Sequence, residues 1–303
     1  MNKNFLVGSA ELLIAALIWG LAFSAQRVGM KYLSPESFTS IRSFIAVAVL
    51  LPFILLIGKI KGVPLLPSDR MERRTLISGG FWCGLVLSLA STSQQYGLIC
   101  ASAGKSGFIT SLYIIFVPLA GVFLGEKINR IHWVAVVLAL AGSYLLCAPE
   151  ESNAVGAGDL WLLACAILFA IHILVIGHYA PETDCIKMSC IQFITAGVLT
   201  GFAAIIKQDT VSLKLLADSA FPLLYCGVCS SGIAFTLQIV SQKHISGAAA
   251  SIIMSMESVF SVLGGYIFLK EKLSTAELAG CAIIFAAVVI AQLPQKKVTA
   301  SAE

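Results

Sequence analysis

Long apolar runs separated by short polar segments dominate the pattern of this chain. A helix that crosses a hydrocarbon layer of about 30 Å needs roughly 20 mostly apolar residues. Ten windows of about that size occur, at 11–28, 38–57, 76–98, 103–124, 131–147, 160–177, 186–206, 220–240, 247–269 and 276–293. The pattern therefore predicts an all-α integral membrane protein with ten transmembrane helices joined by short loops.

The two halves of the chain also resemble each other. A tract of the form Phe-Leu-x-Glu-Lys occurs at 123–127 and again at 268–272. A shift of 143 positions pairs Cys83 with Cys226, Gly84 with Gly227, Ser88 with Ser231, Gln95 with Gln238 and Gly104 with Gly247. Because five helices per repeat is an odd number, the second repeat must enter the membrane from the opposite side, as in many secondary transporters. We expect one repeat at 1–148, a connecting loop outside the cytoplasm at 149–157, a second repeat at 158–293 and a cytoplasmic tail at 294–303.

Composition and charge exclude several other classes of protein. Hydrophobic residues make up 58% of the chain and charged residues 12%, whereas soluble domains average about 25% charged residues. The net charge of +4 is too small to indicate a nucleic-acid partner. If the N-terminus is inside, twelve Lys and Arg residues fall in inner segments and seven in outer ones, with Arg42 within the bilayer. This bias predicts that both termini are cytoplasmic and that the protein lies in the plasma membrane.

Cysteine and histidine patterns give no sign of a cofactor. Most of the nine cysteines lie inside apolar runs, where cysteine acts as a small packing residue. The four histidines do not share a helix face at ligand spacing, so we expect neither a metal nor a cofactor. The chain also lacks a Walker-type phosphate loop, which disfavours ATP-driven pumping.

Several short motifs connect the chain to a known family. They are Ile18-Trp19-Gly20, Arg42, Phe116-Val117-Pro118-Leu119, Leu124-Gly125-Glu126-Lys127, Gly142, Glu257-Ser258-Val259-Phe260 and Lys270-Glu271-Lys272. In the order and spacing of these motifs the sequence resembles the drug/metabolite transporter superfamily, specifically its EamA branch. Ser258 and Lys270 stand where many relatives have Pro and Gly.

The resemblance implies a ten-helix transporter with both termini in the cytoplasm. The first four helices of each half would surround a central cavity, and the fifth and tenth helices would lie outside it. Members of the family move amino acids, other metabolites, drugs or nucleotide sugars, and export from bacterial cells is common among them.

Glu257 and Arg42 are charged residues that lie within predicted helices. Glu257 lies near the middle of the ninth run, where a charge costs at least about 2.5–3.5 kcal/mol. It could bind a cationic group or titrate during transport, or it could be a protonated carboxyl within the packing. Its repeat partner at a shift of 145 is Leu112, so the acid has no counterpart. Arg42 lies about one turn inside the second helix, where it could pair with a substrate carboxylate, gate the outer mouth or extend to the headgroups.

Two matching stripes of small and polar residues provide further candidates. One ends in Ser88 and Gln95, and the other in Ser231 and Gln238. Residues of this kind allow close helix packing and hydrogen bonds between helices, and they could equally line a cavity.

Three more residues complete the candidate set. Trp19 lies mid-helix and is suited to packing or to an aromatic cavity wall, and Tyr113 lies two turns deeper than Lys105 in the fourth helix. Lys105 lies near the outer start of that helix, from which it could extend to the membrane surface or reach the cavity.

These features together predict a secondary active transporter. It would move a small metabolite, amino acid or drug-like solute across the membrane by alternating access, with export as the expected direction. The expected partners are that solute, the lipid bilayer and, as a candidate coupling ion, a proton. The alternative is an integral-membrane enzyme or a channel without transport coupling, but the titratable residues are scattered and the loops are short.

Overall fold

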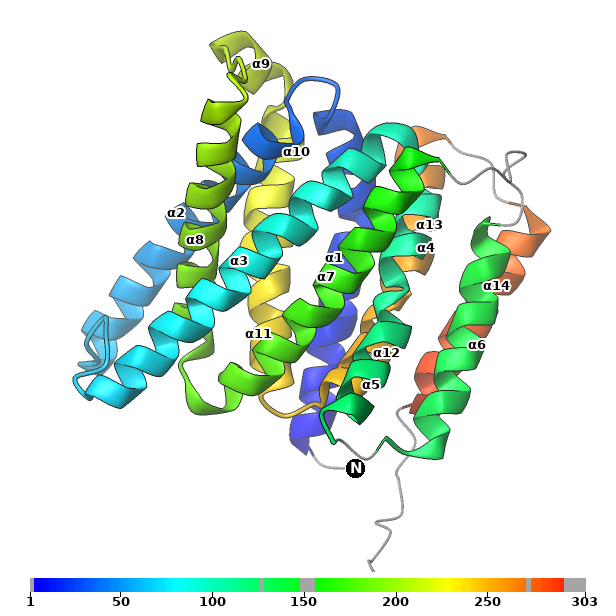
Figure 1. Cartoon of the computed structure of the whole chain (residues 1–303), viewed down its shortest axis with the longest axis horizontal. Helices are drawn as coiled ribbons and strands as arrows, with labels where there is room; N and C mark the ends of the chain where they lie inside the picture. Colours follow the sequence, from blue (N-terminus) through cyan, green and yellow to red (C-terminus); the bar gives the residue numbers. More distant parts are fainter. Residues whose placement is uncertain (1–2, 126–127, 148–155, 271–273, 292–303) are drawn as a thin grey trace, which may run out of the picture.

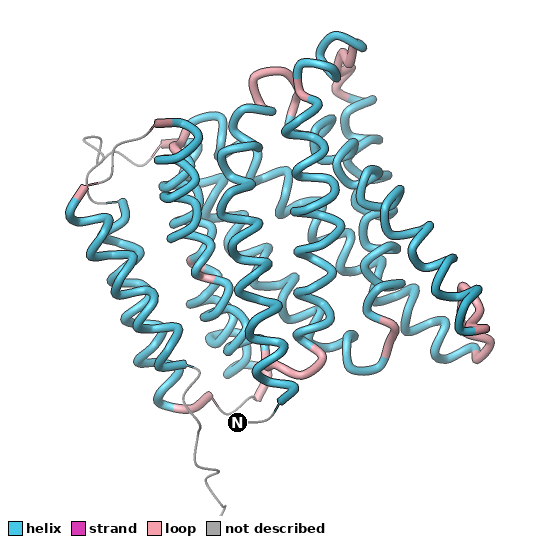
Figure 2. Tube along the Cα trace, turned by 180° about the vertical axis from the view of Figure 1, so that it is seen from behind, coloured by secondary structure: helices cyan, strands magenta, loops and turns pink. Residues whose placement is uncertain are grey.

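The computed structural model describes residues 3–125, 128–147, 156–270 and 274–291, and every element within them is helical (Figure 2). The first half comprises α1 (Lys3–Gly29), α2 (Pro35–Lys61), α3 (Arg70–Cys100), α4 (Ala103–Ser111), α5 (Tyr113–Phe123) and α6 (Arg130–Cys147). The second half comprises α7 (Ala157–Tyr179), η1 (Ala180–Glu182), α8 (Cys185–Ile206), α9 (Leu213–Asp218), α10 (Ala220–Leu224), η2 (Tyr225–Phe235), α11 (Thr236–Gln242), α12 (Gly247–Met254), α13 (Met256–Leu269) and α14 (Thr275–Ala291).

These elements make ten crossings. Eight helical stretches are long and apolar enough to span a membrane, and two shorter apolar helices lie at 130–145 and 278–291. The predicted all-helical membrane fold with two repeats is therefore confirmed. The helices extend beyond the predicted apolar windows because polar residues form their end turns. For example, α3 begins at Arg70, where the side chain of Asp69 accepts hydrogen bonds from the first free amides.

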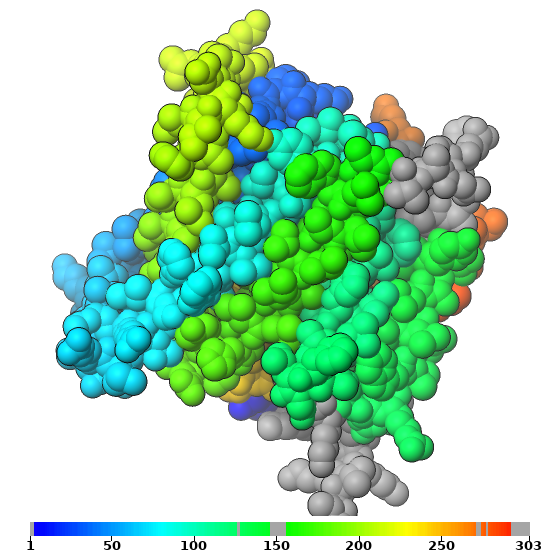
Figure 3. All heavy atoms as spheres, in the orientation of Figure 1, coloured from blue at the N-terminus to red at the C-terminus, as the bar shows by residue number. Residues whose placement is uncertain are grey.

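The packing partners of the helices follow an inverted two-fold arrangement. From the first half, α3 packs against α7 and α8 of the second half. From the second half, η2 packs against α1 and α2 of the first half. In the same way α13 packs against α1, as α4 and α5 pack against α7. Figure 3 shows α3 and α7 side by side on one face of the molecule. The helices α6 and α14 pair with each other at one edge of the bundle (Figure 1).

The first and last described residues lie at the same end of the molecule, as an even number of crossings requires (Figure 1). We refer to this as the N-terminal end and to the opposite one as the α9 end. Several parts of the predictions lie outside the described ranges: Glu126, Lys127, most of the connecting loop at 149–157, Glu271, Lys272 and the tail at 294–303.

The fourth and ninth crossings are interrupted at matching places. The α-helical pattern breaks at Leu112 between α4 and α5, and at Ser255 between α12 and α13. At each break a backbone amide donates to the carbonyl oxygen three residues before it, as in a 3₁₀ turn. The two hydrogen bonds are Ile115 N to Leu112 O and Ser258 N to Ser255 O. Aligning these breaks pairs Glu257 with Ile114 rather than Leu112, so the acid lacks an acidic counterpart in either register.

The ends of these two crossings match in backbone but not in sequence. Gly125 follows α5 with a φ of 86°, and Lys270 caps α13 with a φ of 57°. Glycine adopts this left-handed conformation without strain, whereas lysine does not.

Matched glycines bring the two halves close together. A Cβ atom on Gly84 would lie 2.5 Å from the carbonyl oxygen of Gln192 on α8. One on Gly227, its repeat partner, would lie 2.5 Å from Ile45 and 3.2 Å from the carbonyl oxygen of Arg42 on α2. These two contacts set the spacing of α3 from α8 and of η2 from α2.

Candidate functional site

A narrow central cavity lies between the two halves, with a volume of about 30 Å³ in this conformation. Residues from ten elements line it, and α6 and α14 contribute none, as the resemblance implies. The lining residues are Trp19, Phe23, Gln26, Arg42, Gln94, Thr110, Tyr113, Phe169, Ile173, Ser230, Phe235, Gln238, Met254 and Glu257.

A polar cluster from the first three helices forms one part of this cavity. Arg42 is only 3% exposed, and its Nη1 donates a hydrogen bond of 2.8 Å to Oε1 of Gln26. The Nε2 of Gln95 donates to the same oxygen at 2.5 Å. Because one glutamine oxygen receives both donors, the positive charge of Arg42 meets a neutral dipole, and no carboxylate of the described residues pairs with it. The charge therefore remains available to an anionic group in the cavity.

Glu257 forms another part of the cavity, in the first turn of α13. It is 4% exposed, and its carboxyl lies beside the hydroxyl of Tyr113. Glu257 Oε1 and Tyr113 Oη are close to each other, but neither makes a hydrogen bond of ordinary geometry among the described residues. A buried polar atom left without a partner costs about 1–3 kcal/mol, so this pair is better suited to a ligand than to stabilising the fold.

Close packing of α1 on α13 places Glu257. A Cβ atom on Gly20 would lie 2.3 Å from Cβ of Phe260 and 2.8 Å from the carbonyl oxygen of Glu257. Only glycine leaves room for this approach, so Gly20 helps to define the wall of the cavity next to the carboxylate.

Aromatic side chains close the apolar side of the cavity. Trp19 and Phe235 lie with ring centroids 4.7 Å apart, and Phe169 stacks on Phe235 at 6.3 Å. Trp19 Nε1 also donates to the carbonyl oxygen of Ser230 at 3.3 Å. Ser230 belongs to η2, an eleven-residue π-helical stretch, and π-helical segments are frequent at functional sites.

A second polar pair lies next to this aromatic group. His172 Nε2 and Gln192 Oε1 are 2.8 Å apart and buried, and the His172 ring meets that of Phe235 edge-on at 5.8 Å. Nδ1 of His172 and Nε2 of Gln192 have no hydrogen-bond partner among the described residues. The pair comes from α7 and α8, which are the repeat counterparts of α1 and α2.

The structure brings together five of the predicted site residues, since Trp19, Arg42, Tyr113, Gln238 and Glu257 all line the cavity. The other four do not line it. Gln95 lies behind Gln26, and Ser88 donates to the carbonyl oxygen of Leu85 at 2.7 Å. Ser231 is buried next to the lining residue Ser230, and Lys105 forms an ion pair of 3.0 Å with Asp159 at the start of α7.

Some lining residues were not among the predicted set, notably Gln26 and Gln94. Gln26 follows Trp19 by seven positions, which places both side chains on one face of α1. The seven-residue spacing from Trp19 is therefore the sequence feature that could have identified Gln26 as a cavity residue. Gln94 directly precedes Gln95, and the sequence alone does not distinguish which of the two faces the cavity.

Comparison with known proteins gives one consistent result. A family model described as the EamA-like transporter family matches residues 7–148 and again 156–292. An uncharacterized transporter of Archaeoglobus fulgidus is 28% identical over 283 residues, which cover 93% of this chain and 84% of the relative. The uncharacterized inner membrane transporter YedA of Escherichia coli (strain K12) is 24% identical, with 91% and 88% covered. One crystal structure shares the fold, with a TM-score of 0.74 at 20% identity over 94% of this chain and 96% of that one.

Proposed function

Because the chain belongs to the EamA-like transporter family, and is therefore a multi-pass membrane transporter, we propose that it is a secondary active transporter working by alternating access. Its substrate is a small metabolite, amino acid or drug-like solute, and it exports that solute across the plasma membrane. Both termini are cytoplasmic in this proposal, so the α9 end faces outward. The names of the relatives support transport rather than catalysis.

One observation supports the proposed class of substrate. The cavity is lined by a buried cation, Arg42, and a buried carboxyl group, Glu257, and no ion pair joins them among the described residues. Buried charges without partners are costly, and a ligand with complementary charges removes that cost. A solute with an anionic and a cationic group, as in an amino acid, fits this arrangement, while the aromatic wall around Trp19 would contact its apolar part.

Glu257 also offers a means of coupling to a proton. A carboxylate within a membrane protein that lacks a fixed cationic partner can exchange a proton for a cationic substrate group. In this mechanism the proton and the substrate occupy the site in turn, which couples their movement in opposite directions.

The proposal is tested by counterflow in proteoliposomes. The purified protein is loaded with one member of a panel of neutral amino acids, simple amines, simple carboxylates and drug cations. We expect exchange of solutes that carry both charges and little exchange of simple amines or carboxylates. If no member of a broad panel exchanges, or if exchange does not depend on the charged groups, the proposed substrate class is wrong.

Glu257 variants test the role of the acid directly. Glu257→Gln keeps the shape but cannot ionise, and we expect it to reach the membrane while transport falls at least about tenfold, since a charge-assisted hydrogen bond is worth about 1.5–3 kcal/mol. The pH dependence of the remaining transport should also disappear. Glu257→Leu should be at least as stable as the parent, because it removes a buried polar group. If both variants transport normally across the pH range, Glu257 neither binds substrate nor carries a proton.

A further inference from the structure

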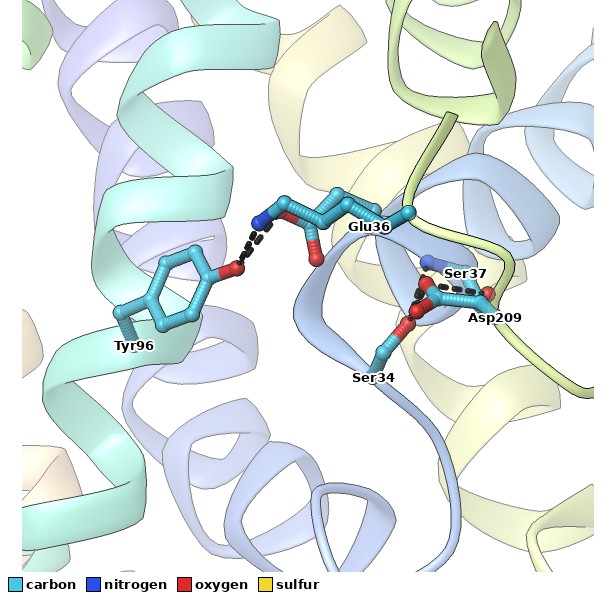
Figure 4. Close-up of polar contacts among 6 residues, drawn as sticks. Ser34, Glu36, Ser37, Tyr96 and Asp209 are labelled. Atoms are coloured by element: carbon cyan, nitrogen blue, oxygen red, sulfur yellow. Dashed lines mark hydrogen bonds and ion pairs between the residues drawn. The ribbon is translucent and has the colours of Figure 1, made fainter. Parts of the chain in front are cut away.

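A group of polar side chains joins three helices at the α9 end (Figure 4). Nζ of Lys207, which caps α8, lies 2.5 Å from Oε1 of Glu36 on α2. The hydroxyl of Tyr96 on α3 donates to the same oxygen at 2.7 Å, and Lys207 Nζ also donates to that hydroxyl. The pKa of Lys207 lies above its usual value because these hydrogen bonds to Glu36 and Tyr96 favour the charged amine.

Neighbouring contacts reinforce this group. Asp209 accepts hydrogen bonds from the hydroxyls of Ser34 and Ser37, at 3.1 Å for Ser37 (Figure 4). The ring of Trp161 on α7 stacks on Tyr96, with centroids 5.0 Å apart. The contacts therefore connect the beginning of α2, the end of α3, the beginning of α7 and the end of α8.

The position of the group matters for access to the cavity. Glu36 precedes the cavity residue Arg42 by six positions on α2, a distance of about 9 Å along the helix axis. Tyr96 follows the cavity residue Gln94 by two positions on α3. The group therefore lies between the cavity and the α9 end.

The N-terminal end has no equivalent in the described part of the chain. There Lys187, near the beginning of α8, donates to the carbonyl oxygen of Pro64 at 2.7 Å and approaches Asp184 of its own N-cap at 3.8 Å. No described ion pair links α8 to α2 or α3 at that end. Within the described ranges, the charged connection between these helices therefore occurs at the α9 end alone.

Because Glu36 is buried, its ion pair with Lys207 is expected to be either fully formed or fully broken. The Glu36 side chain is 5% exposed, and its Oε2 is buried without a partner among the described residues. If Lys207 moved away while Glu36 stayed buried, an uncompensated charge would remain, which is strongly unfavourable. Glu36 is thus stable either paired with Lys207 or exposed to water, and not in between.

We propose that Glu36, Tyr96 and Lys207 form a latch that closes the transport pathway at the α9 end, and that separation of Lys207 from Glu36 opens the cavity to that side. This inference rests on the alternating-access mechanism proposed above. Removing the latch shifts the equilibrium toward the conformation that is open at the α9 end.

Cysteine labelling tests the latch without any substrate. Ser230→Cys, a cavity position, is introduced into a variant lacking the native cysteines, and a charged, membrane-impermeant thiol reagent is added on the α9 side of sealed vesicles. Lys207→Met is suitable because the lysine side chain is about half exposed, 49%, so its loss does not open a core. We expect labelling several-fold faster in Lys207→Met, and a smaller increase in Tyr96→Phe, which keeps the ring stacked on Trp161.

Two controls decide the interpretation. Lys214→Met removes an exposed lysine of α9 at the same end and should leave the rate unchanged. Glu36→Gln combined with Lys207→Met should label no faster than the faster of the two single variants, because both open the same latch. Equal rates in Lys207→Met and the parent, or rates in the double variant that multiply those of the single ones, overturn the proposal. Because the measurement needs no transport, a failed latch and a failed transport assignment remain distinguishable.

Discussion

Each repeat places a set of polar side chains on its first three membrane-spanning helices. Only the set of the first repeat contains a charged residue, Arg42. The first set comes from α1, α2 and α3 and the second from α7, α8 and α11. Arg42 corresponds to Gln192 and Gln95 to Gln238, while Gln26 and His172 lie at different levels of the corresponding helices α1 and α7. The glycine contacts support this matching, because Gly227 packs on the backbone of Arg42 as Gly84 packs on that of Gln192.

The two sets differ in how well their hydrogen bonds are satisfied. In the first, Gln26 accepts from both Arg42 and Gln95, and Oε1 of Gln95 is the one side-chain atom of these three residues that is buried without a partner among the described residues. In the second, Gln238 donates instead to Gln242 at 3.1 Å, and buried atoms of His172, Gln192 and Gln238 lack partners among the described residues. The fold therefore tolerates a neutral polar set at this place. We infer that the charge on Arg42 serves the ligand rather than the architecture.

The largest expected effect comes from making the first set resemble the second. Arg42→Gln copies the residue at its repeat counterpart, Gln192, and should fold, since it removes a buried charge. Transport should fall at least about 30-fold, because loss of one partner of a buried charge pair costs roughly 2 kcal/mol or more. Counterflow in proteoliposomes gives the measurement, and Lys214→Met serves as the exposed control. Normal transport by Arg42→Gln at unchanged abundance would remove Arg42 from the site.

A smaller effect should separate the two matched glycines. Gly84→Ala and Gly227→Ala each force a methyl group into a neighbouring helix, and overpacking of this kind costs about 1–3 kcal/mol of stability. Gly227→Ala moves α2 and with it Arg42, so it should reduce transport more than Gly84→Ala at a similar loss of stability.

Thermal unfolding in detergent, measured beside counterflow, checks this expectation. Gly156→Ala provides the control, since no atom lies within 4 Å of the added group, and it should stay within about 0.5 kcal/mol of the parent. Equal losses of transport in Gly84→Ala and Gly227→Ala would mean that the charged and neutral sets contribute alike.

The smallest effect concerns the matched helix ends. Lys270→Gly gives the second repeat the glycine that the first has at Gly125, and it should raise stability by about 1 kcal/mol by relieving a left-handed lysine. The reverse change, Gly125→Lys, should lower stability by a similar amount. A lower melting temperature for Lys270→Gly would show that the lysine side chain stabilises this end by contacts that outweigh its backbone strain.

The sequence predicted those features that depend on the polarity of single positions. Arg42 and Glu257 were identified because each interrupts an apolar run, and both line the cavity. Ten crossings and the inverted repeat followed from run lengths and an odd helix count. Lys105 shows the limit of this reasoning, because a lysine near a helix end has the same local pattern whether it faces a cavity or pairs with Asp159.

Other features depend on contacts between distant segments and were not predictable. Glu36, Tyr96 and Lys207 lie near the ends of three predicted runs, where charged and aromatic residues are ordinary. Only the packing of α8 against α2 and α3 brings them together. The π-helical form of η2 likewise has no marker in its sequence, since its repeat counterpart in α3 has similar small residues and is α-helical.

The helix α3 is longer than the hydrocarbon layer is thick, so its tilt depends on the surrounding bilayer. Its 31 residues extend about 46 Å, whereas the hydrocarbon layer is about 30 Å thick. The helix accordingly crosses the bundle obliquely (Figure 1), and its first turns, with Arg70, Arg73 and Arg74, reach the level of the headgroups. Because α3 carries both Gln94 and Tyr96, a change in bilayer thickness that altered the tilt of this helix would move a cavity residue and a residue of the proposed latch together.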